Sequence, residues 1–184
     1  MTTSSAETDA KTILLLRHAK SAWGLDVDDH DRPLSGRGKR DAVAVGELLA
    51  ARHLNPDLVL CSAATRARET WLRAVKGGAQ AGQVRYTERV YEAPAADLAK
   101  LIRKTPDDAR SVLLIGHAPG IPDLVEYLAV RTPADPAWER MEQKFPTSGL
   151  AILQFRGPWS DAGRQRAELI DFEVPRGAKN KAKK

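Results

Sequence analysis

Arginine and histidine residues follow three short apolar runs of this 184-residue sequence, and these residue types suit phosphoryl chemistry. The runs and the residues that follow them are 13–16 with Arg17 and His18, 58–61 with Arg66, and 112–115 with His117. Two guanidinium groups suit a phosphate because they bind its oxygens in pairs and keep their charge at ordinary pH. A single arginine or histidine after a strand usually serves packing or solubility, so the repetition of the pattern is what predicts a site.

The two histidines can take different roles in such a site. His18 falls in the tight turn after the first run, where a backbone carbonyl could hold one ring nitrogen and direct the other. A neutral imidazole held in this way is a competent nucleophile toward phosphorus. His117, protonated beside the phosphate, would stabilise the charge on the transferring group. Arg66 opens a predicted helix, whose free N–H groups add affinity for an anion.

These side chains can meet if the apolar runs are neighbouring strands of one sheet. Open α/β sheets bind ligands at the carboxyl ends of buried parallel strands. The expected strands are 13–16, 58–61, 84–86, 112–115, 149–155 and 168–174, the last two as an antiparallel pair joined by a polar loop through Trp159. Helices are expected from Ser35, over 65–75, over 95–104 and around 124–128, whereas 131–146 is expected to be irregular. This order predicts an α/β fold, a three-layer α/β/α sandwich with a mostly parallel central sheet.

The positive charge of the chain is concentrated at its C-terminus. The formal net charge is +5, and residues 176–184 carry five positive charges and no acid, so the rest of the chain is neutral. We therefore expect a single domain over 12–175, a flexible N-terminal tail over 1–11, a basic flexible C-terminal tail over 176–184, and no specific nucleic-acid surface.

No run is long enough to span a membrane. The single cysteine, Cys61, and the absence of a signal-peptide pattern predict a cytoplasmic protein.

The loop over 25–34 is rich in acidic residues, as a metal site would be. An EF-hand that began at Asp26 would need glycine at its sixth position, where the sequence has Asp31, and the spacing fits no zinc pattern. We therefore expect a surface loop, with Asp31 or a neighbour facing the site, and no metal ion or other cofactor.

Four segments resemble, in the right order, the motifs of the histidine phosphatase superfamily. They are 17–23 (Arg-His-Ala-Lys-Ser-Ala-Trp), which resembles the Arg-His-Gly signature, 31–35 (Asp-Arg-Pro-Leu-Ser) with Gly38, 62–70 (Ser-Ala-Ala-Thr-Arg-Ala-Arg-Glu-Thr), which carries the second arginine, and 116–120 (Gly-His-Ala-Pro-Gly), which carries the second histidine. Ala19 and Ala118 replace the usual glycine and asparagine, which we expect to reshape the pocket without abolishing it. The resemblance runs from about 13 to 155, and the Ala-Lys-Ser after His18 is most similar to SixA-type phosphohistidine phosphatases.

This resemblance implies a phosphoglycerate mutase-like fold and a phosphatase that carries the phosphoryl group on His18. The pocket around it would be formed by Arg17, Arg66 and His117. Glu92, just past the third expected strand, is the implied proton donor, with Asp31 as the alternative acid. The implied substrate is phosphohistidine on a protein or a small phosphorylated metabolite, with no cofactor and no membrane partner.

Several alternatives remain open at this point. A cysteine phosphatase needs cysteine and arginine separated by five residues, but four residues separate Cys61 from Arg66 and six separate it from Arg68, so that register fails. A small-molecule phosphomonoesterase, a metal phosphatase built on the acidic loop, and a phosphate-binding module without turnover are the other candidates. A phosphoglycerate mutase is disfavoured because the chain lacks long insertions. The oligomeric state is not predicted.

Overall fold

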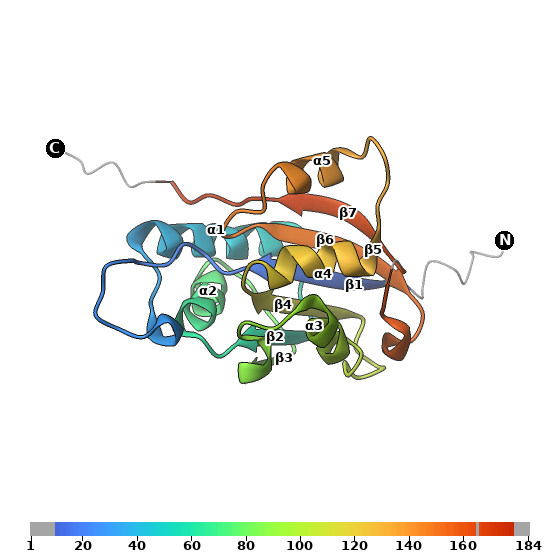
Figure 1. The fold of residues 1–184 in the computed structure, drawn as a ribbon, viewed down its shortest axis with the longest axis horizontal. Helices are drawn as coiled ribbons and strands as arrows, with labels where there is room; N and C mark the ends of the chain where they lie inside the picture. Colours follow the sequence, from blue (N-terminus) through green and yellow to red (C-terminus); the bar gives the residue numbers. More distant parts are fainter. Residues whose placement is uncertain (1–9, 165, 179–184) are drawn as a thin grey trace.

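The computed structural model describes residues 10–164 and 166–178, which form one mixed β-sheet with helices on both faces (Figure 1). The strands are β1 (Ala10–Arg17), β2 (Leu58–Ser62), β3 (Gln83–Thr87), β4 (Ser111–Gly116), β5 (Ala129–Val130), β6 (Leu150–Arg156) and β7 (Ala167–Glu173). Their order across the sheet is β3-β2-β4-β1-β6-β7-β5. The first strand of the chain therefore lies at the centre of the sheet.

Two helical layers complete the predicted three-layer α/β/α sandwich. The α-helices are α1 (Gly36–Ala51), α2 (Thr65–Lys76), α3 (Ala95–Ile102), α4 (Gly120–Leu128) and α5 (Pro136–Gln143), and the short 3₁₀ helices are η1 (Asp29–Asp31), η2 (Glu88–Val90) and η3 (Trp159–Asp161). α1 and α2 pack together on one face of the sheet, and α3 and α4 on the other (Figure 1). Among the described residues, no helix has the length and apolar character needed to cross a membrane.

The apolar run in β1 is continuous because both faces of this strand are buried. Ile13 and Leu15 pack with α3 and α4, whereas Leu14 and Leu16 pack with α1 and α2. Each of these four side chains is at most 1% exposed. Because successive side chains of a strand point to opposite faces of the sheet, this one apolar run contributes to both cores.

The sheet is mostly parallel, as predicted, but it is mixed because it also contains antiparallel pairs. β3, β2, β4 and β1 are parallel neighbours, but β6 runs antiparallel to both β1 and β7. The antiparallel pairing of the last two strands is as predicted. The direction of β6 follows from its starting point, because the carbonyl of Gly149 accepts a hydrogen bond from the N–H of Arg17 at the carboxyl end of β1.

α1 begins at the predicted residue, and α2 ends within one residue of its predicted bound. Ser35 caps α1, and its hydroxyl accepts a hydrogen bond from the N–H of Gly38 at 3.1 Å. α2 ends at Gly77. The two helices approach closely at Gly46, where a Cβ atom would lie 1.8 Å from the carbonyl oxygen of Ala74.

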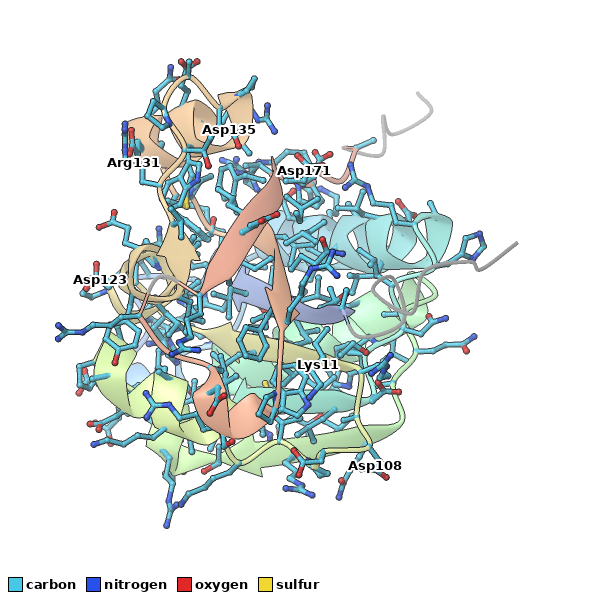
Figure 2. All side chains as sticks on the ribbon, turned by 90° about the vertical axis from the view of Figure 1, so that its right-hand side faces the viewer. Lys11, Asp108, Asp123, Arg131, Asp135 and Asp171 are labelled. Carbon is cyan, nitrogen blue, oxygen red and sulfur yellow. The ribbon has the colours of Figure 1, made fainter. Side chains whose placement is uncertain are left out.

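The expectation that residues 131–146 are irregular was wrong, whereas the connection between β6 and β7 passes through Trp159 as predicted. α5 lies within residues 131–146: its N-cap Asp135 accepts a hydrogen bond from the N–H of Ala137 at 2.8 Å, and the helix packs against β7. Figure 2 shows Arg131 and Asp135 beside α5, on the opposite side of the molecule from Asp108. Trp159 is fully buried in the core, and its indole N–H donates to the carbonyl of Ala109 at 2.9 Å.

The structured chain extends past the bounds of 12–175 at both ends. β1 begins at Ala10. After β7, the guanidinium of Arg176 and the N–H of Gly177 both donate hydrogen bonds to the carboxylate of Asp41. Asp41 is 1% exposed, and a buried carboxylate requires such partners. The predicted tails otherwise fall on 1–9 and 179–184, outside the described residues.

Candidate active site

The parallel half of the sheet brings the four predicted pocket residues to one edge. β2, β4 and β1 are adjacent and parallel, so their carboxyl ends lie together. Arg17 ends β1 and precedes His18, Arg66 lies in the first turn of α2, and His117 follows β4. The rings of His18 and His117 have centroids 5.0 Å apart, and Arg66 Nε lies 3.3 Å from His18 Nε2.

His18 is held in one orientation by the turn that follows β1. Its Nδ1 lies 2.7 Å from the carbonyl oxygen of Ala19, and because a carbonyl only accepts, Nδ1 carries the ring hydrogen. Nε2 therefore keeps its lone pair and faces Arg66. Burial, opposed by the bond to Ala19 and reinforced by the charges of Arg66 and Arg17, lowers the pKa of His18 to about 3. The imidazole is neutral at pH 7, as a nucleophile must be.

Thr70 ties this turn to α2. Its hydroxyl accepts a hydrogen bond from the N–H of Ala19 at 3.0 Å and donates to the carbonyl of Arg66 at 2.7 Å. One buried side chain thus joins the backbone beside His18 to the backbone of Arg66. This arrangement fixes the nucleophile candidate relative to the arginine.

Arg66 is engaged by an acidic residue of the 25–34 loop. Arg66 Nη2 lies 2.9 Å from Asp29 Oδ2, and Arg66 Nη1 donates to the carbonyl oxygen of Asp29 at 2.5 Å. The same carboxylate accepts a hydrogen bond from the hydroxyl of Tyr91 at 2.8 Å. Hydrogen bonds from Arg32 and Tyr91 hold the pKa of Asp29 well below its usual range, so this residue is ionised. The guanidinium of Arg66, which is suited to a phosphoryl group, is therefore already paired with the carboxylate of Asp29.

His117 is predicted to be protonated beside a phosphate, and its surroundings without one favour the neutral form. Burial, and then the charge of Arg66, lower its pKa to about 4, which makes it neutral at pH 7 in this structure. Its Nε2 lies 2.8 Å from the hydroxyl oxygen of Ser62, whereas its buried Nδ1 has no hydrogen-bond partner among the described residues. A negative charge nearby would raise this pKa and favour the protonated form.

Arg17 is positioned by the segment that precedes β6. Its Nη1 donates to the carbonyl oxygen of Phe145 at 2.8 Å, and the N–H of Ser148 lies 3.1 Å from the carbonyl of Arg17. Burial lowers the pKa of the guanidinium. Its buried Nε has no hydrogen-bond partner within the described residues, so it is available to an anion.

A cavity of about 570 Å³ opens beside this group of side chains. Arg66, His117, Asp29, Glu92 and Ala118 are among its lining residues. Glu92 has a φ of 52°, in the left-handed region that is costly for a residue with a Cβ. The position of Ala118 in the wall agrees with the expectation that this replacement affects pocket shape.

The structure separates the two acids considered as proton donors. Glu92 lines the cavity, whereas the exposed Asp31 contacts His30 at 3.5 Å and is not among the lining residues. The neighbour of Asp31 that reaches the site is Asp29. Sequence reasoning did not assign roles to Asp29, Ser62 or Thr70, although Ser62 and Thr70 fall within the motif that carries Arg66.

The side chains considered for cysteine or metal chemistry do not form such sites. Cys61 is buried, and burial raises the pKa of its thiol. Across residues 10–164 and 166–178, no group of three or more histidine, cysteine or acidic side chains could hold a metal ion.

A neutral histidine with one unprotonated ring nitrogen, beside arginines at the carboxyl edge of an α/β sheet, is suited to a protein that handles phosphoryl groups. The chain belongs to the histidine phosphatase superfamily: the sequence profile of its branch 1 matches residues 13–155.

Relatives and solved structures agree with this membership. The uncharacterized protein Rv1276c of Mycobacterium tuberculosis (strain ATCC 25618 / H37Rv) is 42% identical over 162 residues, which is 88% of this chain and 100% of that protein. A proposed phosphohistidine phosphatase SixA from Nakamurella multipartitia is 35% identical with a TM-score of 0.78, covering 90% of this chain and 96% of that one. Its counterpart from Agrobacterium tumefaciens is 32% identical with a TM-score of 0.71, covering 90% and 99%. The fold is therefore SixA-like, and these similarities support a phosphatase.

Proposed function

We propose that this protein hydrolyses phosphohistidine on a partner protein and carries the phosphoryl group on His18. The observation that carries the proposal is the unprotonated Nε2 of His18, which accepts a hydrogen bond from Arg66 Nε at 3.3 Å while Nδ1 is held by Ala19. In the first step, Nε2 forms a bond to phosphorus as the phosphorus–nitrogen bond of the substrate breaks, and the departing imidazole takes up a proton. In the second step, water attacks phosphorus, inorganic phosphate leaves and His18 is restored.

Arg17, Arg66 and His117 would bind the phosphoryl oxygens in both steps. The free donor of Arg17 and the buried, unpaired Nδ1 of His117 are suited to this role. The negative charge of the phosphoryl group would raise the pKa of His117 from about 4, so that the ring gains a proton as the group binds. Charge-assisted hydrogen bonds of this kind would stabilise the transition state.

Trapping of the phosphoenzyme tests the role of His18. With a radiolabelled phosphodonor, the wild-type protein should acquire an acid-labile, base-stable label, and His18→Ala should acquire none. Turnover should fall about a thousandfold or more in that variant, as expected for a lost nucleophile. His53→Asn is the matched control, because His53 is exposed and asparagine tolerates its φ of 54°. A label that persists in His18→Ala would contradict the proposal.

Glu92 is our candidate for the proton donor when the leaving group needs one. An alkoxide leaving group needs an acid more than an imidazole does, so Glu92→Gln should slow the hydrolysis of alkyl phosphates about 10- to 100-fold and spare phosphohistidine. Asp31→Asn, the alternative acid, should leave both reactions unchanged because Asp31 does not line the cavity. If Glu92→Gln slowed the hydrolysis of both substrates equally, this role of Glu92 as proton donor would be contradicted.

A small phosphorylated metabolite is the second candidate substrate, and the cavity of about 570 Å³ favours it because it exceeds the needs of a phosphoryl group alone. The comparison of kcat/KM between a phosphohistidine protein and a panel of sugar and nucleotide phosphates decides between the two. A strong preference for one metabolite would overturn the proposal that the substrate is a phosphorylated protein.

We also propose that the reaction needs no metal ion and occurs in the cytoplasm. Every step above uses side chains of this chain alone, so turnover should survive prolonged chelation. The single cysteine of the sequence suits a reducing compartment.

A further inference from the structure

A groove continues from the catalytic cavity along η2 and α3. A second cavity, of about 410 Å³, shares Ala93 and Pro94 with the catalytic one. A third, of about 250 Å³, shares Arg89, Leu101 and Lys104 with the second. These three cavities therefore lie next to one another, from the catalytic residues to the β3 edge of the sheet. We call the second and third together the α3 groove.

The inner part of the α3 groove is apolar. Leu58 and Leu60 of β2 and Leu101 of α3 line its third cavity. β3 is the outermost strand on this side, and α3 leaves an opening between itself and that strand. The groove can therefore bury apolar parts of a partner as well as bind its charges.

The rim of the α3 groove has uncompensated positive charge. Its acidic residues are Asp97, which binds Lys100 at 2.7 Å, and Glu88, whose contact with His30 at 3.0 Å balances its charge only when that ring is protonated. In the part of the chain that the structure describes, neither the guanidinium of Arg89 nor the ammonium group of Lys104 forms a hydrogen bond or an ion pair, and both residues are exposed.

Arg85 adds a third positive charge at the same rim. Its guanidinium is bound to the neutral amide of Gln83 at 2.9 Å, so its charge is not compensated either. Charges of one sign around a groove attract and orient a partner of the opposite sign.

We propose that the α3 groove binds an acidic, extended segment of the protein whose phosphohistidine enters the catalytic cavity. The inference rests on the proposed function and names the surface that would recognise its substrate. A phosphoryl group and its imidazole need only the catalytic cavity, whereas the groove beyond it offers an apolar floor and a positive rim to the residues that follow. Acidic side chains pair with Arg85, Arg89 and Lys104, and small apolar ones contact Leu101.

Peptide binding tests the groove without requiring turnover. Two short synthetic peptides carry the same hydrolysis-resistant phosphohistidine analogue, one followed by a run of glutamates and the other by glutamines. The wild-type protein should bind the glutamate peptide roughly tenfold more tightly at low salt, and the preference should shrink as salt is added. In the double variant Arg89→Glu, Lys104→Glu the preference should disappear, while turnover of a small ester stays at the wild-type level.

The matched control reverses the same number of charges elsewhere. Arg73→Glu, Lys76→Glu changes the last turn of α2, on the opposite face of the sheet, and should keep the preference for the glutamate peptide. Thermal melting of both double variants checks that they fold. Equal binding of the two peptides by the wild type, a preference that survives in the groove variant, or its loss in both variants would each overturn the proposal.

Failure of the groove is distinguishable from failure of the proposed function. A protein that forms the phosphoenzyme on His18 but shows no peptide preference contradicts the groove alone. A protein that never forms the phosphoenzyme contradicts the proposed function.

Discussion

Asp29 places a carboxylate on the same guanidinium that a phosphoryl group would need. A phosphoryl group that approaches Arg66 must compete with contacts of 2.9 Å and 2.5 Å from Asp29, and it also meets a like charge. Asp29→Ala should therefore lower the inhibition constant of inorganic phosphate or vanadate roughly two- to fivefold, which corresponds to the loss of a partly exposed ion pair.

The control for this prediction is Asp31→Ala, which removes an exposed acid two residues away that contacts only His30 among the described side chains. It should leave the inhibition constant unchanged. If Asp29→Ala bound phosphate more weakly, Asp29 would orient Arg66 for the anion. The prediction that Asp29 competes with the anion for Arg66 would then be wrong.

Arg66 and Arg68 provide a second comparison between neighbouring residues. Arg66 is 5% exposed and contacts His18, whereas Arg68 is exposed and lies over the ring of Tyr86. Arg66→Ala should weaken phosphate binding about 10- to 100-fold, the value of a hydrogen bond to a charged group, and Arg68→Ala should not. Product inhibition by phosphate measures both. Similar losses in the two variants would indicate a general effect of positive charge.

Among the site residues, the sequence predicts those that follow strands. It does not predict Asp29, which reaches the site from a loop. Arg17, Arg66 and His117 could be selected because each follows an apolar run, and parallel strands bring such positions together. Asp29 lies in a loop with four other acidic or histidine candidates, and its contact with Arg66 depends on how that loop folds back. No local pattern encodes that contact.

At the scale of elements, α1 and α2 are held close by a glycine. In an isolated helix, Gly46→Ala would be favourable because alanine is the better helix former. Here a Cβ would lie 1.8 Å from the carbonyl oxygen of Ala74, so the helices must separate. We expect Gly46→Ala to lower the free energy of unfolding by about 1–3 kcal/mol, measured by urea titration.

Gly36→Ala is the control within the same helix, because its nearest neighbour, the end of the Arg40 side chain, lies 3.8 Å from the added Cβ. It should be neutral or slightly stabilising. A neutral result for Gly46→Ala would show that α1 can move away from α2 at no cost.

The sequence predicts the long elements well and the last third of the chain less well. The strands and helices up to Leu128 follow from apolar spacing and from caps such as Ser35 and Gly77. α5 was missed because its segment contains several prolines, although Asp135 followed by a proline at the first helical position is a helix-start signal.

At the scale of the whole molecule, two buried neutral histidines make stability depend on pH. The pKa of His18 is lowered to about 3 and that of His117 to about 4 from an ordinary value of 6.5. The unfolded chain therefore binds more protons than the folded one below about pH 6.5, and the free energy of unfolding falls as the pH drops from 6.5 toward 4. Each histidine contributes at most about 1.4 kcal/mol per pH unit.

Urea titrations between pH 7 and 4.5 measure this slope. His18→Gln should reduce it, because the replacement does not titrate. An identical slope in His18→Gln and the wild type would mean that His18 is not held neutral by the fold.

The central place of β1 has a consequence for protein synthesis. The N–H groups of Arg17 and His18 are bound by Gly149 and Gly116, and β1 pairs with residues 111–116 and 150–156. Because β1 precedes both partner strands in the sequence, a growing chain presents His18, the proposed nucleophile, before the segments that hold it have left the ribosome. Prematurely terminated products that stop before β6 should therefore carry the Arg17-His18 motif without the activity of the folded protein.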